Sequence, residues 1–372
     1  MRLINATKME AGYTMAVRPD GREMLVVVVK GTFSIPRGGE EPCLAERQVP
    51  LILTDTFSGE EGFSAPIHEM DFAPGKPRCD VLLNGSAYAL RGKPADRVRV
   101  SLRVGAWTKS FDVVGERVWR SSHLGTRSTA PESFAVMPIS YDNAFGGIDR
   151  SCEDEGKHHY FLENPVGVGY LENQESASLD GKPLPNTEEI GNPVVEPNGD
   201  YRPMAFGPLG RAWRQRIQYG GTYDQHWLDN IFPFLPPDFR EEYYQAAPVD
   251  QWIAHPLGGE DVELLNLIPQ GRLVFRLPVD TVPVEFYYKS GDRKKIKGII
   301  DTLFFEPDLA RFTMSWRVAL PLRRSLHEIR LIVAGRVPPE GYEEPGAERR
   351  LAGKPHYASL ADLVAASRTG GQ

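Results

Sequence analysis

Apolar and polar residues alternate along several stretches of the chain, and this alternation predicts β-strands. Over residues 97–104 the even positions are valine or leucine and the odd positions are arginine or serine. That pattern is typical of a half-exposed antiparallel strand. Residues 26–29 are all valine and follow a turn at residues 19–21. Because β-branched side chains lose rotamer freedom in helices, this run predicts a fully buried strand, with a buried helix as the disfavoured alternative.

Similar patterns group into two sets of strands. The first set covers residues 15–35, 79–83, 97–104, 107–114 and 117–120, and its last three members read as a meander. The second set covers residues 262–267, 272–277, 284–289, 295–305 and 311–320. The second set either completes a sandwich with the first or stands beside it.

Glycine and proline are frequent, with 36 and 31 residues, and imply many short elements joined by tight turns. Such a chain fits an all-β architecture best, so we expect a mainly β fold of antiparallel, sandwich-like sheets. Helical periodicity predicts short C-terminal helices at residues 322–334 and 359–368, the second capped by Ser359. A charged linker at residues 340–354 separates them.

The central part of the chain has a different character. Residues 206–251 are dense in aromatic side chains but show no sustained helical or strand period. Proline and glycine divide this segment into short turns, so we expect an ordered, irregular wrap that directs its rings toward a common packing partner. The predicted regions are an N-terminal β region (1–140), the central wrap (141–260), a second β region packing with the first (261–322), and short helices with a charged tail (323–372).

Composition narrows the class of protein. A net charge of -7 argues against a surface built for nucleic acid. Three widely spaced cysteines, Cys43, Cys79 and Cys152, form no CxxC pair, which indicates neither a zinc cluster nor a disulfide framework and favours a reducing compartment. The sequence shows no secretion signal and no apolar run long enough to span a bilayer. We therefore expect a cytoplasmic protein without membrane association, metal or cofactor.

Catalytic signatures are absent from the sequence: it has no GxSxG elbow, no phosphate-binding GxxxxGK[ST] loop and no HExxH motif. Three polar clusters remain, and structural roles are favoured for each. They are Asp224, His226 and Asp229; His158 and His159 beside Glu153, Asp154 and Glu155; and His68, Glu69 and Asp71. Turn capping by Asp224 explains the first cluster better than catalysis does. A solvated histidine pair explains the second cluster better than metal binding does. The prediction is that the chain is not an enzyme.

The aromatic wrap supplies the candidate binding residues. Trp, Tyr and Arg concentrate binding energy at interfaces, and arginine can stack on rings or bind a partner's carboxylate. The same residues could equally organise a rigid core, and the sequence leaves both interpretations open. The candidates are Phe145, Phe206, Arg211, Trp213, Arg214, Tyr219, Tyr223, Trp227 and Phe239.

Several separated blocks carry a resemblance to a known family. The blocks are AFGG (144–147), FGPLGRAW (206–213), YGGTYDQHW (219–227), FPFLPPDF (232–239), YYQAAPVDQ (243–251), HPLGGEDVELLNLIPQGRLVFRLP (255–278) and DTLFFEPDLARFTMSWR (301–317). Their order resembles an uncharacterised-domain family encoded in bacterial type VI secretion loci, beside genes for the VgrG spike, the PAAR tip and toxic effectors. Where a histidine is common before the proline of the NLIP block, this chain has Ile268, which argues against imidazole chemistry there.

The resemblance implies an accessory protein of type VI secretion. Such a protein would act as an effector chaperone or adaptor, binding a toxic effector in the cytoplasm and loading it onto the VgrG and PAAR spike without catalysis. Two alternatives stay open: a hydrolase using Asp224, His226 and Asp229, and a structural component of a phage-tail-like assembly.

Overall fold

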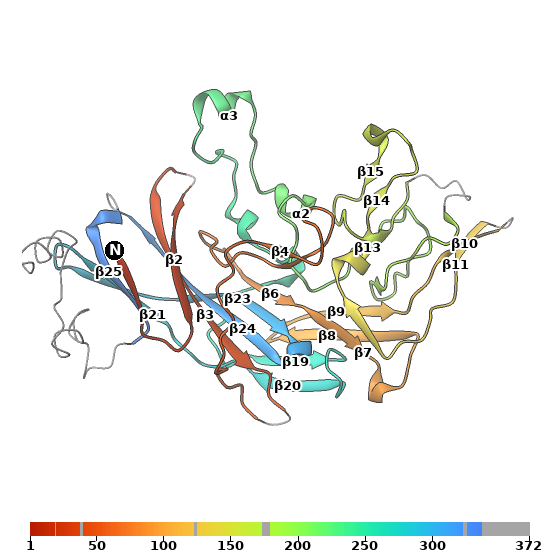
Figure 1. Cartoon of the computed structure of the whole chain (residues 1–372), viewed down its shortest axis with the longest axis horizontal. Coiled ribbons are helices and arrows are strands. Elements are labelled where there is room, and N and C mark those ends of the chain that lie inside the picture. The colour runs from red at the N-terminus through yellow and green to blue at the C-terminus, as the bar shows by residue number, and fades with distance from the viewer. Residues whose placement is uncertain (19, 38–39, 123–124, 173–178, 323–325, 337–372) are drawn as a thin grey trace, which may run out of the picture.

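Three large β-sheets form the framework of the computed structural model, which describes residues 1–18, 20–37, 40–122, 125–172, 179–322 and 326–336 (Figure 1). The mainly β prediction is confirmed, since the α-helices in these ranges are the short α2 (Arg214–Ile217) and α3 (Gln225–Asn230). No helix in the described ranges is long and apolar enough to cross a membrane.

The six-stranded sheet brings together strands from both ends of the chain. Its order is β18 (Trp252–Ile253), β6 (Cys79–Leu83), β23 (Ile299–Glu306), β24 (Arg311–Pro321), β3 (Glu23–Ser34) and β2 (Glu10–Val17). The β6 and β23 strands pair in parallel, and every other pairing in this sheet is antiparallel. The four valines of β3 are fully buried, as their β-branched run predicts.

Two further sheets pack with this one. The five-stranded sheet has the order β17 (Thr187–Glu188), β9 (Trp107–Val114), β8 (Arg97–Val104), β19 (Asp261–Leu265) and β20 (Arg272–Arg276). The four-stranded sheet has the order β1 (Arg2–Asn5), β25 (Ile329–Ala334), β21 (Pro283–Tyr288) and β22 (Arg293–Lys297). The pairing of β1 with β25 is parallel. Strands predicted from the first and second sets thus share the same sheets.

One contiguous core joins the three sheets, which makes the architecture sandwich-like. The residues of β8 at even positions, from Val98 to Val104, point into this core. The residues between them, at odd positions, face outward, as predicted. The core receives Phe312, Met314 and Trp316 from β24. Burial of apolar area between these sheets supplies the main driving force for folding.

Two of the predicted strands differ in detail. The run 295–305 is two strands, because the chain passes from β22 in one sheet to β23 in another at Gly298. A Cβ atom at Gly298 would lie 3.0 Å from the Cβ of Trp316, so glycine permits the close crossing. The strand expected at 117–120 begins at Trp119 and pairs with β11 (Gly125–Ser128) instead of extending the meander.

The helix predicted over residues 322–334 is wrong. A short 3₁₀ turn, η7 (Leu326–Glu328), leads into β25, which pairs with β1 on one side and β21 on the other. Ile329 and Ile332 are buried in the core, so pairing on both edges and burial of β-branched side chains outweigh the weak helical period. The helix predicted at 359–368 lies outside the described residues.

Small two-stranded sheets and 3₁₀ turns build the rest. The sheets are β10 (Trp119–Ser122) with β11, β7 (Gly85–Tyr88) with β12 (Val136–Ile139), β13 (Phe145–Gly146) with β16 (Val168–Gly169), β14 (Ile148–Asp149) with β15 (His159–Tyr160), and β4 (Thr56–Phe57) with β5 (Pro66–His68). The turns are η1 (Leu90–Gly92), η2 (Tyr141–Asn143), η3 (Glu155–Lys157), η4 (Glu241–Tyr244), η5 (Val249–Gln251) and η6 (Pro307–Leu309). Trp119, Phe145 and Tyr201 form a second, smaller core under this region.

Candidate functional site

A groove of about 1170 Å³ runs along β2, the outer strand of the six-stranded sheet. We call it the edge groove. Every residue from 11 to 17 lines it, together with the loop residues Leu51, Leu53 and Phe72 and, from the central segment, Phe234. Among the described residues that line it, Glu23 is the one that carries a charge. An open, largely apolar groove of this size is a feature of binding sites for protein partners.

The sequence of β2 explains both walls of the edge groove. Every second residue of the strand lies on one face, and Tyr13, Met15 and Val17 on that face remain partly exposed, at 39%, 37% and 44%. On the opposite face, a Cβ atom at Gly12 would lie 2.7 Å from Leu51 and 2.8 Å from Phe72. Glycine at position 12 therefore lets the loop pack directly on the strand backbone.

The second part of the site is a projection that we call the aromatic lobe, residues 221–239. Figure 1 shows it as the segment around α3 that extends away from the sheets. Its helix starts at Asp224, whose Oδ1 accepts a hydrogen bond from the backbone N of Trp227 at 2.8 Å. At its base, the Thr222 hydroxyl donates to Asp238 at 2.7 Å.

Aromatic rings in the lobe pack on one another. The Trp227 ring lies 4.7 Å from Tyr223 and 5.6 Å from Phe232 between centroids, both in edge-to-face geometry. The indole Nε1 donates to the carbonyl of Phe234 at 2.9 Å. Tyr223, Phe232 and Phe234 are about half exposed or more. The lobe thus presents a cluster of ordered rings to solvent beside the edge groove.

The expectation of one common packing partner for the aromatic wrap is wrong. Phe206 lies in the main core against Phe111, with ring centroids 4.7 Å apart, and Trp213 is in the same core. The lobe rings pack away from that core. Burial divides the segment into two parts, and composition alone carries no signal for that division.

Three of the candidate residues hold the scaffold together. Phe145 is buried in the smaller core, with its ring 5.0 Å from Tyr201. Phe239 is buried beside Tyr244, and Tyr219 stacks under the guanidinium of Arg240 at 4.8 Å. Of the nine candidates, Tyr223 and Trp227 come together in the lobe, and Arg214 is exposed near Glu163.

Beneath the central segment lies a layer of buried charges, of which the sequence pattern singles out Glu69 and Asp71 but not the extent of the layer. Arg216 is 2% exposed and donates to Glu69 at 2.6 Å, to the Leu209 carbonyl at 3.0 Å and to the Tyr243 carbonyl at 2.9 Å. Lys76 lies 3.6 Å from the other oxygen of Glu69. Burial raises the pKa of Glu69, but Arg216, Lys76 and Arg211 outweigh it and hold the pKa below its usual value.

The same layer explains Arg211. Its Nε lies 2.7 Å from Asp55, and its Nη2 lies 3.1 Å from Glu69. Asp55 precedes β4 and Glu69 follows β5, so the two acids stand on the two loops that supply Leu53 and Phe72 to the edge groove. Arg211 therefore joins these loops to the central segment, a contact that fits the core-organising interpretation of this residue.

The buried charged layer could have been predicted from charged residues that stand within otherwise apolar strands. Lys30 follows the four valines of β3 and lies 2.5 Å from Asp71. Arg317 stands in the apolar run of β24 and binds Asp301. Strand periodicity directs both to the face opposite the core, where they need a buried acid.

The candidate catalytic side chains serve local structure. Asp224 caps α3, Asp229 accepts from Gln225 at 2.8 Å, and the His226 ring lies 3.2 Å from Asn230. No hydrogen bond joins Asp224, His226 and Asp229 within the described structure. No group of three or more His, Cys, Asp or Glu side chains suited to a metal ion occurs among the residues searched, which are the described ones.

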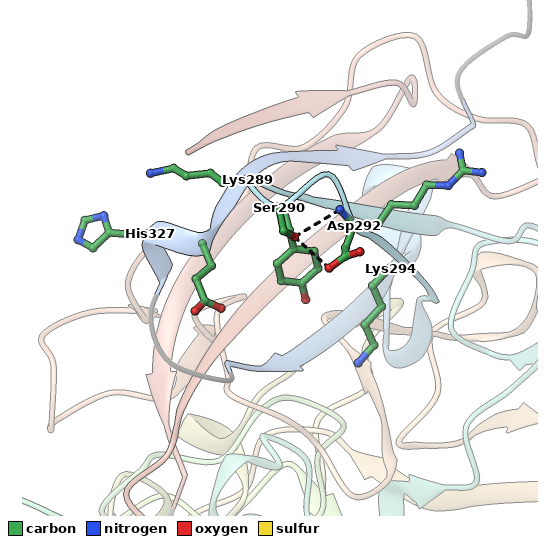
Figure 2. Close-up of a pocket in the computed structure, with 8 residues that line it drawn as sticks. Lys289, Ser290, Asp292, Lys294 and His327 are labelled. Atoms are coloured by element: carbon green, nitrogen blue, oxygen red, sulfur yellow. Dashed lines mark hydrogen bonds between the residues drawn. The ribbon is translucent and has the colours of Figure 1, made fainter.

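A second hollow, of about 790 Å³, lies beside the turn between β21 and β22 (Figure 2). Ser290 donates to Asp292 at 2.9 Å within the turn. Figure 2 shows Lys289 and His327 extending toward one side of the view and Lys294 extending toward another. Among the described residues that line the hollow, these three side chains therefore form no pair suited to general acid–base or nucleophilic catalysis.

The carboxylate of Glu306, beside the buried layer, makes the fold sensitive to acid. It lies 3.3 Å from His68 Nε2 and accepts from Arg311 at 2.6 Å. Burial raises the pKa of Glu306, but hydrogen bonds from His68 and Arg311 outweigh burial and lower it to about 2. A carboxyl group more acidic in the folded than in the unfolded chain stabilises the fold above its unfolded pKa. This contribution disappears as pH falls from about 4.5 toward 2.

We expect Glu306→Gln to weaken the acid dependence of stability. The free energy of unfolding should fall less steeply for the variant than for the wild type between about pH 5 and 2.5. Urea unfolding at a series of pH values measures both slopes. Parallel slopes would show that Glu306 contributes no pH-linked stability.

Comparison with protein families places the chain in a known group. Residues 20–317 match the family described as "Uncharacterized protein conserved in bacteria (DUF2169)". No curated protein and no solved structure was found to be similar to the chain. The matched range contains the loops that line the edge groove, the central segment with the lobe, and β24 as far as Arg317. Because it covers most of the 372 residues, the chain belongs to this bacterial family.

Proposed function

We propose that this protein is a non-catalytic adaptor of type VI secretion. It binds a toxic effector in the cytoplasm and loads it onto the spike formed by VgrG and PAAR proteins. The resemblance of its sequence blocks to proteins encoded in type VI secretion loci supports both the assignment to this secretion system and the choice of partners. The structural observation that carries the proposal is the open, apolar edge groove beside the exposed rings of the aromatic lobe.

An adaptor must bind tightly enough to protect its cargo and still release it. Apolar burial supplies affinity without covalent chemistry, at roughly 25 cal/mol per Å² of apolar surface removed from water. Phe232 and Phe234 expose large rings on a lobe that Trp227 keeps ordered. Ordered aromatic side chains are the residues that dominate binding energy at interfaces, because little conformational entropy is lost when they bind.

The alternatives have less support. The candidate hydrolytic residues Asp224, His226 and Asp229 each bond to neighbours in or at the start of α3. A structural component of a tail-like assembly makes a different prediction about secretion, and the genetic experiment below separates it from an adaptor.

Deleting the gene is expected to leave the secretion apparatus able to fire while the cognate effector disappears from the secreted fraction. The measurement is secretion of VgrG and of the effector encoded beside this gene, in wild-type, deletion and complemented strains. Loss of both proteins would indicate a structural part of the machine. Secretion of both in the deletion strain would exclude the adaptor role.

Effector binding by two surface variants tests where the binding site lies. Phe232→Asp places a charge among exposed lobe rings, and loss of one aromatic anchor typically costs about 2 kcal/mol or more, a loss of roughly 30-fold in affinity. Leu309→Asp, at the exposed η6 turn, is the matched control. We expect the first variant to lose effector binding and the second to retain it. Equal binding by both variants would remove the lobe from the proposed site.

A further inference from the structure

The geometry points to a specific binding mode at the edge groove. We propose that β2 accepts an extended, uncharged segment of the partner protein as an added strand of the six-stranded sheet. The inference rests on the proposed adaptor function only for the identity of the partner, an effector. The strand addition itself is argued from β2 and its surroundings.

The first argument is that β2 is the long unprotected edge among the large described sheets. Natural proteins protect sheet edges with short strands, charged residues, particularly lysine, or proline. The edge strands β17 and β18 have two residues each, and β1 has four. The edges β20 and β22 read RLVFR and RKKIK, with basic residues along them. By contrast, β2 reads EAGYTMAV over eight residues, without lysine, arginine or proline.

The second argument concerns the backbone of β2. Arg18 N donates to the Arg22 carbonyl at 2.9 Å, and the Glu23 carbonyl turns to the other side, toward Leu322 N at 2.9 Å. Bonded and non-bonded pairs alternate along an antiparallel ladder. Gly12, Thr14 and Ala16 therefore bond to β3.

The intervening residues direct their N–H and C=O groups into the edge groove. They are Ala11, Tyr13, Met15 and Val17. Within the described structure these outward groups make one hydrogen bond, a long one of 3.4 Å from the Thr14 hydroxyl to the Met15 carbonyl. A row of free donors and acceptors at strand spacing matches the backbone of another extended chain.

The third argument is the chemistry of the walls. The groove borders both faces of β2, with Leu3 and Tyr13 toward one face and Leu51 and Phe72 toward the other. Side chains of an added strand point alternately to the two faces, so both sets would meet apolar surface. In the described lining, charge is limited to Glu23, which stands opposite Val17 at one end. The occupant is thus an apolar or hydroxyl-bearing segment. Because Glu23 is negatively charged, basic residues are favoured over acidic ones at the ends of that segment.

The fourth argument favours a lone segment over a second copy of this protein. Phe234 of the lobe lies against the β2–β3 turn, since a Cβ atom at Gly21 would be 3.0 Å from its ring. Leu53 stands on the neighbouring loop, 72% exposed. A second folded chain pairing edge to edge would bring its own lobe and loop against these walls. An unfolded segment of about seven residues, roughly 23 Å long, enters without that obstruction.

Hydrogen exchange of the full chain tests the inference at backbone resolution. Two probes are used: the effector encoded beside the gene, and a short synthetic peptide with alternating valine and threonine and a lysine at each end. Strand addition predicts at least tenfold slower exchange at the amides of Ala11, Tyr13, Met15 and Val17 when a probe binds. Gly12, Thr14 and Ala16, already bonded to β3, should change little.

A pair of variants separates backbone pairing from side-chain docking. Met15→Pro removes one outward N–H and spares the ladder to β3, whereas Met15→Ala removes the side chain and keeps the N–H. We expect Met15→Pro to weaken effector binding at least tenfold more than Met15→Ala. If Met15→Pro fails to fold, the exchange pattern of the wild type still decides the question.

The outcomes distinguish this inference from the adaptor function. Effector binding that leaves the four outward amides unprotected overturns strand addition and leaves the adaptor role intact. Protection by the peptide without any effector binding supports strand addition and counts against the adaptor role. Lack of protection by both probes overturns the inference. Concentration-dependent protection of the free chain with a dimeric mass would assign the edge to a second copy and overturn the chosen occupant.

Discussion

Replacing Arg216 by methionine is expected to lower the free energy of unfolding by about 3–5 kcal/mol, the usual cost of breaking a buried ion pair by removing one partner. The guanidinium satisfies Glu69 and the carbonyls of Leu209 and Tyr243 at once. Methionine fills similar space without hydrogen bonds, so it leaves a buried carboxylate with less compensation. Chemical denaturation followed by tryptophan fluorescence measures the loss.

Arg214→Met is the matched control, two residues away on the same helix. The Arg214 side chain is 65% exposed and lies 3.4 Å from Glu163, so the change should stay within about 0.5 kcal/mol. Adding Glu69→Gln to Arg216→Met should restore part of the stability, because the uncompensated charge is then removed. Equal losses for Arg214→Met and Arg216→Met would contradict the role assigned to the buried layer.

Trp213→Ala is expected to cost about 3–5 kcal/mol, as truncations of buried aromatic side chains do. The ring lies edge to face against Tyr141 at 5.2 Å and is almost fully buried. A Cβ atom at Gly210 would lie 2.4 Å from the indole nitrogen, which shows how closely the backbone packs on it. The cavity left by alanine would loosen the join between the central segment and the core.

Trp227→Ala separates folding from binding. Its ring contacts Tyr223 and Phe232 within the lobe, so its loss should change global stability by much less than Trp213→Ala while weakening effector binding. Melting temperature and effector affinity measured on both variants give the comparison. Global destabilisation by Trp227→Ala equal to that of Trp213→Ala would show that the lobe belongs to the core.

Local pattern predicted the strands well where burial on one face was strong. The alternation at Val98–Val104 translates directly into core positions, because a period of two fixes which side chains face inward. The consecutive valines of β3 are buried on both faces of their sheet, as an uninterrupted β-branched run indicates. The wrong helix over residues 322–334 has the opposite cause. A short apolar run fits both periods, and the choice was made by pairing of β25 with β1, more than 320 residues away in sequence.

The candidate site was harder to predict because it depends on which neighbours are missing. That β2 would form a strand follows partly from its sequence, but that it has no neighbour on one side among the described strands follows from the whole sheet order. Likewise Trp213 and Trp227 look equivalent in sequence, and their different burial reflects packing of distant residues. Arg211 was a reasonable interface candidate whose partners, Asp55 and Glu69, lie far upstream.

The pairing of β3 with β24 also sets the timing of folding during synthesis. These neighbours are separated by about 280 residues, since β3 ends at Ser34 and β24 begins at Arg311. At roughly 5–20 residues per second, β24 is made about 15–60 s after β3. Until then the valines of β3 have only the β2 side of their hairpin paired. The nascent chain therefore carries an exposed, aggregation-prone strand for most of its translation, and the sheet that bears the edge groove is completed only when most of the chain has been made.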